Sequence, residues 1–480
     1  MSPIIDSPPE FVALILAATS GARLYPLASP SHPKHLLPVA GIALVVRQLH
    51  VLAACGFCES VIAIAHEDKA TAAFFKDVDG IEQQSSTSFA FKGTLKITLH
   101  QLPDDCSGSV QALRNIEEAS VISPSSHVVV IPGDIVITDK TVLEQFANAH
   151  RQGCTDTLKT ACTMILADVG EEDENGLPLK ESSKAKKNGL SREEDQIEYI
   201  ALSMDPNSTP RVVWKQSKID VEEDEDMIGT SPKLVLPKPR LRCGAVTRVR
   251  TDWHDVHLYI LAPWVRQLCA ARPSLVSIKG DLIPLLVDSQ FQGVESAFGD
   301  QEEAKAIYHS TFSSTNLEGE TESVGSADEM FAVRAQVVNG SKAIRASTLP
   351  AYLIACRETV SLGLADEDKE ANPCLLFPKH ATLNSKYNSV IMKDAELGEK
   401  NQIKSSVIGS GAKLGAKCKL NNVVIMNNAV IGDNVILQNA VLGEACVIGE
   451  NCSLSHVRVG HGKVIPPGTK EKGDLSMDEI

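Results

Sequence analysis

The sequence lacks any long apolar run: none approaches the roughly 18 consecutive apolar residues that a membrane span requires. Its first residues, MSPIIDSPPEF, also lack the basic and then apolar layout of a secretion signal. We therefore expect no membrane association and a cytoplasmic (cytosolic) location. With 480 residues, of which 43% are hydrophobic, the chain is long enough for two or three domains with sizeable buried cores.

Positive charge is also scarce, because 46 Lys and Arg face 61 Asp and Glu, for a net charge of −15. This balance argues against general nucleic-acid binding, since phosphate contacts need clustered Lys and Arg. Much of the acidic excess lies in two polar runs whose self-repulsion favours disorder. We predict acidic insertions near residues 168–196 and 218–232, and a further disordered insertion at 300–330.

The 12 cysteines form no paired framework. The one Cys-x-x-Cys spacing, from Cys55 to Cys58, has no second pair to complete four zinc ligands. We interpret it as a corner between a helix and a strand that happens to hold two thiols.

A period of 17 residues marks the C-terminal part of the chain. Glycines preceded by Leu or Ile recur at Gly398, Gly415, Gly432 and Gly449. A triangular coil of two hexapeptides and one shortened hexapeptide has this length, so successive coils place the same aliphatic residue in register. Asparagines between the aliphatic residues suit corners where φ is positive. We predict a left-handed parallel β-helix of hexapeptide repeats at residues 381–468, and a tail at 469–480.

Strand and helix patterns alternate in the N-terminal part. Residues 11–18 form a continuous apolar run, typical of a buried parallel strand. Further strands are expected at 61–65, 96–102 and 127–131, with helical patterns between them. The alternation predicts an α/β, Rossmann-like domain with a mostly parallel sheet over residues 8–299. A connecting segment at 331–380 then leads to the β-helix.

The loop after the first strand, within LAATSGARLYPLASPSHPKHLLPV (residues 16–39), contains the candidate chemistry. Here a strand runs into a loop that contains Gly21, with Arg23 and Lys34 close behind. Such a loop can hold the phosphates of a nucleotide through free backbone N–H groups and two cations.

These residues resemble the nucleotidyltransferase signature of nucleotide-sugar pyrophosphorylases, Leu-Ala-Ala-Gly-x-Gly-Thr-Arg-Leu followed by Pro-Lys-x-Leu-x-Pro-Val. The matching residues are Gly21, Arg23, Leu24, Pro33, Lys34, Leu36, Pro38 and Val39. Residues 108–112, GSVQA, resemble the base-side segment of that family, and Gly133-Asp134 resembles its metal-binding pair. The resemblance implies a phosphate pocket that includes Gly21, Arg23, Lys34 and Asp134.

Departures from the signature predict that this pocket is vestigial. Thr19 replaces the first glycine of the loop, and a β-branched residue resists the crowded backbone geometry around a triphosphate. Pyrophosphoryl transfer also needs a second carboxylate to share Mg²⁺ with Asp134. In the enzymes it precedes the β-helix, where this chain has IRASTLPAYLIA (residues 344–355) and no acid, and Trp253-His254-Asp255 lies too early to replace it. We predict no catalytic residue, no metal and no cofactor.

A degenerate nucleotidyltransferase-like domain joined to a β-helix resembles the gamma-subunit family of eukaryotic translation initiation factor 2B. The motifs that carry this resemblance are Val256-His257-Leu258-Tyr259, SIKGDLIPLLV at residues 277–287, and Gln290-Phe291. The chain also stops soon after the coils, without the helical-repeat domain of the epsilon subunit.

The resemblance implies a non-enzymatic partner of an epsilon-type subunit and of the other subunits of a decameric guanine-nucleotide exchange factor. That assembly acts on the initiator-tRNA-carrying GTPase, and no direct nucleic-acid binding is expected of this chain. Outward-facing aliphatic residues of the β-helix, such as Val424, Ile436 and Val447, are candidates for a subunit interface, although interior packing suits each of them as well.

Two enzymatic alternatives remain open. A nucleotide-sugar pyrophosphorylase of the mannose-1-phosphate guanylyltransferase type shares both domains in the same order, and Arg23 and Lys34 favour it. A hexapeptide-repeat acyltransferase would use a coil histidine as its base, for which His456 and His461 are candidates. Each histidine also suits a turn, and Arg23, Lys34 and Asp134 also suit structural roles at strand ends.

Overall fold

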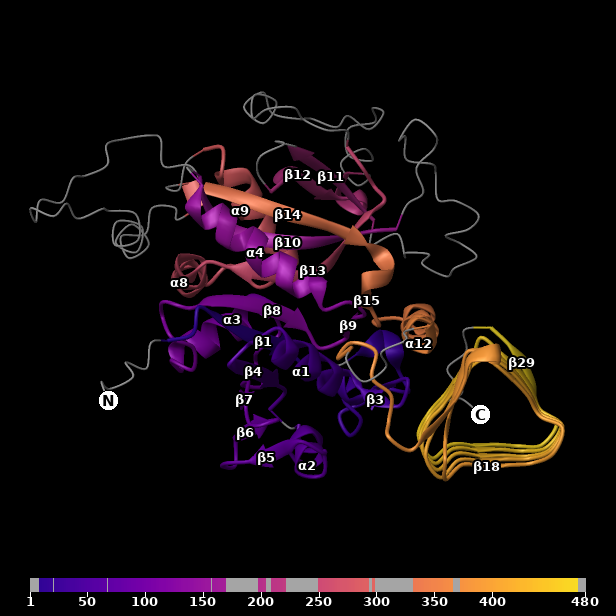
Figure 1. The fold of residues 1–480 in the computed structure, drawn as a ribbon. Helices are drawn as coiled ribbons and strands as arrows, with labels where there is room; N and C mark the ends of the chain where they lie inside the picture. The colour runs from indigo at the N-terminus through magenta and orange to yellow at the C-terminus, as the bar shows by residue number, and fades with distance from the viewer. Residues whose placement is uncertain are drawn as a thin grey trace, which may run out of the picture.

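The computed structural model describes residues 8–19, 21–66, 68–156, 158–169, 197–203, 209–221, 249–292, 296–297, 331–365 and 372–473. An α/β domain lies beside a prism of stacked coils, and helix α12 (Leu349–Ala365) lies between the two (Figure 1). The predicted insertions at 168–196, 218–232 and 300–330 fall almost wholly outside the described residues. None of the described helices combines the length and the apolar character needed to cross a bilayer.

The α/β domain is built on one large sheet with the strand order β11-β12-β14-β10-β13-β8-β1-β4-β7-β6-β5. Its strands are β1 (Phe11–Leu16), β4 (Glu59–Ile64), β5 (Ile81–Gln83), β6 (Ser88–Phe91), β7 (Leu95–Gln101), β8 (His127–Pro132), β10 (Lys159–Asp168), β11 (Glu198–Ser203), β12 (Arg211–Ser217), β13 (Trp253–Leu261) and β14 (Phe331–Asn339). The neighbours β8-β1-β4-β7 pair in parallel, whereas β13 runs antiparallel to β8 and β10. The predicted parallel sheet is confirmed for this N-terminal part.

Helices cover both faces of the sheet, which explains the uninterrupted apolar run of β1. Val12 and Leu14 contribute to one core, and Ala13 and Ile15 contribute to the opposite one. The first core includes α3 (Ser109–Glu118), α8 (Pro263–Ala271) and α9 (Ile283–Ser289), and the second includes α1 (Leu44–Ala54), α2 (Lys69–Lys76) and α4 (Thr141–Thr155). Because successive strand residues point to opposite faces, a strand buried on both faces must be apolar throughout.

The predicted connecting segment at 331–380 is wrong in its first part. Strand β14 lies inside the large sheet, between β10 and β12, and β15 (Ala343–Arg345) pairs with β9 (Ile135–Ile137). The α/β domain therefore extends beyond residue 299. A polar stretch before β14 resembles a domain boundary in the sequence, but here it interrupts a single domain.

The C-terminal strands form a stack of coils with a triangular cross-section, here called the coil stack (Figure 1). Its strands are β16 (Ala381–Asn384), β17 (Ser389–Met392), β18 (Glu396–Leu397), β19 (Gln402–Lys404), β20 (Val407–Ile408), β21 (Lys413–Leu414), β22 (Lys419–Ile425), β23 (Val430–Ile431), β24 (Ile436–Leu442), β25 (Val447–Ile448), β26 (Ser453–Ser455), β27 (Arg458–Val459), β28 (Val464–Ile465) and β29 (Lys470–Lys472). Most neighbours pair in parallel, and Leu397, Leu414, Ile431 and Ile448 lie in register, as the period of 17 predicts. Asn422, Asn428 and Asn434 adopt φ of 56° to 57° at corners.

The predicted end of the coils at residue 468 is too early. Strand β29, within the predicted tail, pairs in parallel with β26. Pro466 and Pro467 do not stop the coil stack because they lie between β28 and β29, where no ladder hydrogen bond requires their missing N–H.

The α/β domain and the coil stack share a buried apolar junction. Val407, Val424 and Val441 of the coil stack pack in one cluster with Tyr352 and Leu353 of α12. Val424 is thus neither an interior residue of the coils nor free for another subunit, whereas Ile436 and Val447 are exposed, at 45% and 36%.

His461 adds a polar contact to this junction. Its ring stacks on that of His32, with centroids 3.8 Å apart and planes 7° apart. Its Nε2 donates to the carbonyl of Leu27 at 2.8 Å, and its Nδ1 accepts from the backbone N–H of Glu444 at 3.0 Å. The Nε2 bond therefore joins the coil stack to the α/β domain, whereas the Nδ1 bond, made within the coil stack, orients the ring.

Candidate functional site

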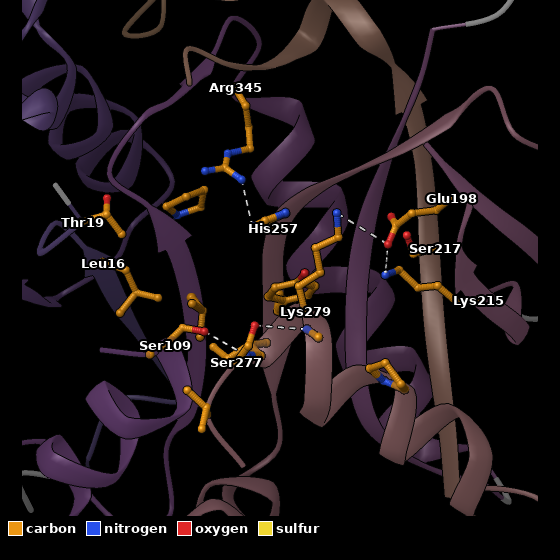
Figure 2. A pocket seen from close by; sticks show the side chains of 18 of the residues that line it. Leu16, Thr19, Ser109, Glu198, Lys215, Ser217, His257, Ser277, Lys279 and Arg345 are labelled. Carbon is orange, nitrogen blue, oxygen red and sulfur yellow. Dashed lines mark hydrogen bonds and ion pairs between the residues drawn. The ribbon is translucent and has the colours of Figure 1, made fainter. Parts of the chain in front are cut away.

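A cavity of about 880 Å³ opens at the carboxyl ends of β1 and β8, where parallel α/β sheets commonly bind ligands (Figure 2). Its lining comes from the loop after β1, the start of α3, strands β12 and β13, and the segment before α9. Thr19, Lys34 and Gly133 line it, together with Arg345 from the end of β15.

Asp134 lies behind the cavity wall, in the turn between β8 and β9, and its carboxylate forms ion pairs with two cationic side chains. Lys34 Nζ lies 2.8 Å from Oδ2. Arg345 donates from Nε to Oδ1 at 3.1 Å and from Nη2 to Oδ1 and Oδ2 at 3.0 and 2.9 Å. The pairing of β15 with β9 sets this geometry, since it places Arg345 beside Ile135, the residue after Asp134.

Asp134 is charged in this setting. Burial alone would raise the pKa of the Asp134 carboxyl, but the charges and hydrogen bonds of Arg345 and Lys34 outweigh burial and hold that pKa well below its usual range. Arg345 gains in turn: burial would lower the pKa of its guanidinium, and Asp134 raises it. The three side chains form one buried ion cluster with two cations and one anion.

The place at which the sequence lacks a second acid is occupied by Arg345. Mg²⁺ takes free carboxylate oxygens as ligands, whereas both oxygens of Asp134 are bonded to Lys34 and Arg345. Among the described residues, those two cations are the side chains that contact the Asp134 carboxylate. The segment that should supply a negative charge to share the metal ion thus supplies the positive charge of Arg345.

His257 continues the cluster into the cavity. Its Nδ1 accepts from Arg345 Nη1 at 2.8 Å (Figure 2). Burial, followed by the charge of Arg345, holds the pKa of His257 well below its usual range, so the imidazole is neutral. The backbone φ of His257 is 59°, which is unusual for a non-glycine residue in a strand. His257 lies at a bulge in the pairing of β13 with β10.

A second ion cluster adjoins the first, because the N–H of His257 donates to Asp255 Oδ1 at 2.8 Å. Lys215 Nζ lies 2.6 Å from Glu198, and Lys279 Nζ lies 3.6 Å from Glu198 (Figure 2). Lys215 Nζ also lies 3.4 Å from Asp255. Tyr259 donates its hydroxyl to Asp255 at 2.8 Å. Burial would raise the pKa of Asp255, but Lys215 outweighs it and lowers that pKa, so this cluster is also charged.

The base-side segment, residues 108–112, is hydrogen-bonded to the segment before α9. The N–H of Val110 donates to the carbonyl of Val276 at 2.8 Å, and Ser109 Oγ accepts from the N–H of Ile278 at 2.8 Å. A Cβ on Gly108 would lie 2.2 Å from the Val276 carbonyl oxygen. The close approach of the Val276 backbone therefore accounts for the glycine at this position.

The structure separates the four predicted pocket residues. Lys34 and Asp134 are bonded to each other, but neither Gly21 nor Arg23 is among the described residues that line the cavity. Gly21 has φ of 68°, and a Cβ there would lie 2.9 Å from Ala28 Cβ and 3.2 Å from Lys34 Cβ, so the glycine makes room for both side chains. Arg23 is exposed, and its carbonyl accepts from Arg458 of the coil stack.

The coil histidines have structural contacts. His456 has φ of 60° at a corner, where its Nε2 bonds Asn439 at 3.0 Å and its Nδ1 bonds Ser455 at 3.0 Å. His461 docks the coil stack on the α/β domain through Nε2, and its Nδ1 accepts from the backbone N–H of Glu444 within the coil stack. Neither ring nitrogen of either residue is free to act as a base.

Sequence reasoning missed four charged or polar side chains of the site: Arg345, His257, Glu198 and Lys215. Arg345 had a usable signal, a cation in the segment that should supply the second acid. Glu198 and Lys215 had none, because an acid and a lysine on two neighbouring strands look like exposed residues until burial pairs them.

Comparison with known proteins agrees with this architecture. A family profile described as nucleotidyl transferase matches residues 12–184, and one described as GMPPB C-terminal domain matches residues 386–465. The chain is 24% identical to "Translation initiation factor eIF2B subunit gamma" of Schizosaccharomyces pombe over 349 residues. This match covers 72% of the chain and 64% of the length of the relative. The N-terminal part of the chain thus matches a nucleotidyl transferase profile, and the chain is similar to a gamma subunit of eIF2B, which confirms the resemblance that its motifs predicted.

Proposed function

We propose that this chain is a non-catalytic subunit of a translation initiation factor 2B guanine-nucleotide exchange complex. It pairs with an epsilon-type subunit, and the pair promotes GDP/GTP exchange on the initiator-tRNA-carrying GTPase. Similarity to the gamma subunit supports the proposal. Exchange needs binding surfaces rather than a reactive centre, because a factor that prefers the nucleotide-free GTPase lowers its affinity for nucleotide.

The observation that carries the non-catalytic assignment is the closure of Asp134 by Lys34 and Arg345. A metal-dependent nucleotidyltransferase needs that carboxylate for Mg²⁺ and the lysine for phosphate. Here each neutralises the other, and Arg345 adds a second cation. The pocket with Gly21, Arg23, Lys34 and Asp134 is in this view a structural remnant, and no cofactor is required.

A column of exposed aliphatic residues supports a partner surface on the coil stack. Val430, Val447 and Val464 lie in register on neighbouring coils and are 38%, 36% and 67% exposed. The face that carries Val424 already packs on α12. We assign the Val430 column to a partner subunit of the same complex. We further propose that the coil stack is a left-handed β-helix of hexapeptide repeats and that the protein is cytosolic.

The test is reconstitution with an epsilon-type subunit from the same source. We expect a heteromeric complex that accelerates GDP release from the GTPase, and we expect Val447→Asp and Val464→Asp to weaken its assembly. Lys470→Asp, an exposed charge reversal outside that column, is the matched control and should assemble normally. A stable homo-oligomer that ignores the epsilon-type subunit would contradict the proposal.

The second candidate function is a mannose-1-phosphate guanylyltransferase type of pyrophosphorylase, which the match to the GMPPB C-terminal domain favours. Incubation of the purified chain with GTP, Mg²⁺ and mannose 1-phosphate separates the two. We expect no pyrophosphate and no calorimetric heat on titration with GTP. Sustained release of pyrophosphate would establish the enzyme instead.

A further inference from the structure

A cluster of metal-binding side chains lies at the edge of the α/β domain opposite the cavity. His127 begins β8, whereas the cavity opens at the carboxyl end of that strand. His150 and Cys154 are four residues apart on α4, and therefore lie on one face of the helix. Ligand atoms of all three side chains lie within 4.8 Å of one another.

We propose that His127, His150 and Cys154 bind one Zn²⁺ ion. Imidazole and thiolate are the ligands that zinc prefers, usually in tetrahedral geometry. His150 Nε2 lies 2.9 Å from His127 Nδ1. Two nitrogens on a tetrahedral Zn²⁺, each about 2.05 Å from the ion, are about 3.3 Å apart. The two nitrogens need to separate by a few tenths of an ångström, and the rings need to turn so that both nitrogen lone pairs point at the ion. Water completes the fourth position.

Neighbouring groups already orient these ligands. The other nitrogen of His150, Nδ1, bonds Thr163 Oγ1 at 2.8 Å, an outer contact of the kind that fixes the ring of a metal-binding histidine. The Phe11 ring lies 5.7 Å from that of His127 and 6.2 Å from that of His150, forming an apolar wall. Cys154 reaches solvent, which provides a path for the ion.

The charge state suits a cation. Burial, and then the proximity of His127, lower the pKa of His150 to about 3, and burial lowers that of His127, so both imidazoles are neutral at physiological pH. Zn²⁺ takes the place of the proton shared by His150 Nε2 and His127 Nδ1, and that proton moves to the nitrogen of its own ring that does not bind the ion. The Cys154 thiol releases its proton to solvent and becomes the thiolate ligand. Burial, and then the charge of Glu10, raise the pKa of the Cys154 thiol, so the ion itself must displace this proton.

The other group of potential ligands, His32, Glu444 and His461, does not share this geometry. Its two rings stack face to face, so their nitrogens do not converge on one point, and both nitrogens of His461 are bonded to the backbone. Docking of the coil stack explains that group.

The experiment uses the full-length chain, stripped with chelator and titrated with Co²⁺ and Zn²⁺. We expect one equivalent of Co²⁺ with a near-ultraviolet thiolate-to-cobalt charge-transfer band, displaced by Zn²⁺. Cys154→Ser should abolish the band, and Cys154→Ser and His127→Ala should each weaken Zn²⁺ binding by at least about tenfold. Thr163→Val, which removes the outer contact, should also weaken Zn²⁺ binding by about tenfold or more.

Cys58→Ser, a change at an exposed cysteine elsewhere in the same domain, is the matched control and should leave band and affinity unchanged. Far-ultraviolet circular dichroism checks that each variant is folded. The proposal is overturned if the wild-type chain gives no charge-transfer band, if the band survives Cys154→Ser, or if the band disappears in Cys58→Ser.

Discussion

The guanidinium of Arg345 holds both carboxylate oxygens of Asp134, 211 residues away in the sequence, through three hydrogen bonds of 2.9 to 3.1 Å. Asp134 is fully buried, so its charge depends on this contact and on Lys34. Through its third nitrogen, Nη1, Arg345 also sets the tautomer of His257, whose Nδ1 must accept from it. One arginine thus organises the residues that a nucleotidyltransferase would need for its metal.

Arg345→Met should lower the free energy of unfolding by about 3 kcal/mol, because it leaves a buried carboxylate with a single cation. Urea unfolding followed by circular dichroism measures this. Lys379→Met, which breaks an exposed ion pair of 4.0 Å with Asp79, is the control and should change stability by less than about 0.5 kcal/mol. If Arg345 and Asp134 act as a pair, Asp134→Asn combined with Arg345→Met should cost less than the sum of the single changes.

His35 should make the fold acid-sensitive. Burial lowers the pKa of His35 to about 4, whereas an unfolded histidine titrates near 6.5. Below pH 6.5 the unfolded chain gains a proton that the folded chain does not bind, so stability falls as the pH drops from about 6.5 to about 4. In His35→Gln this slope should be shallower by about 1 kcal/mol per pH unit. His380→Gln, at an exposed histidine, should keep the wild-type slope.

Gly415→Ala should damage the coil stack. The added Cβ would lie 2.6 Å from the backbone carbon of Gly432 on the next coil, and the in-register backbone has no flexible end that could move away. We expect a loss of about 2 kcal/mol in urea unfolding. Gly280→Ala introduces the same methyl group where the nearest atom lies 3.5 Å away, and its stability should remain near that of the wild type.

His461→Ala should weaken the junction between the two domains. It leaves the carbonyl of Leu27 and the N–H of Glu444 without a partner, at an expected cost of about 1 to 3 kcal/mol. His461→Phe keeps the stack on His32 and should lose less. His456→Asn, at a corner where φ is 60°, is the control because Asn tolerates that conformation, and equal losses in His461→Ala and His456→Asn would contradict the docking role.

The sequence predicted the coil stack well because each coil repeats the same pattern, so the register follows from spacing alone. It also predicted the parallel centre of the sheet, since β1 is apolar on both faces. It placed β14 and β15 in a connecting segment, because strand pairing between distant parts of the chain leaves no local signal. Arg345 had a local signal, a cation where an acid was expected, but its partner Asp134 becomes apparent only when β15 pairs with β9.

The same reasoning explains why Arg23 and Lys34 have separate roles. Both match the phosphate-loop signature, but their side chains leave the loop in different surroundings. Lys34 is buried on Asp134, whereas Arg23 is exposed beside Arg458. A motif fixes which residues are present, and the fold decides which of them face the cavity.

The register of the coil stack limits how its height can change. Residues at corresponding corners, such as Gly415 and Gly432, sit directly above one another. Excising one complete coil would rejoin the chain at the same corner and preserve every inward side chain of the coils that remain. A deletion one residue shorter would turn inward side chains outward in all later coils. Insertions and deletions in the coil stack are therefore tolerated only in multiples of one complete coil.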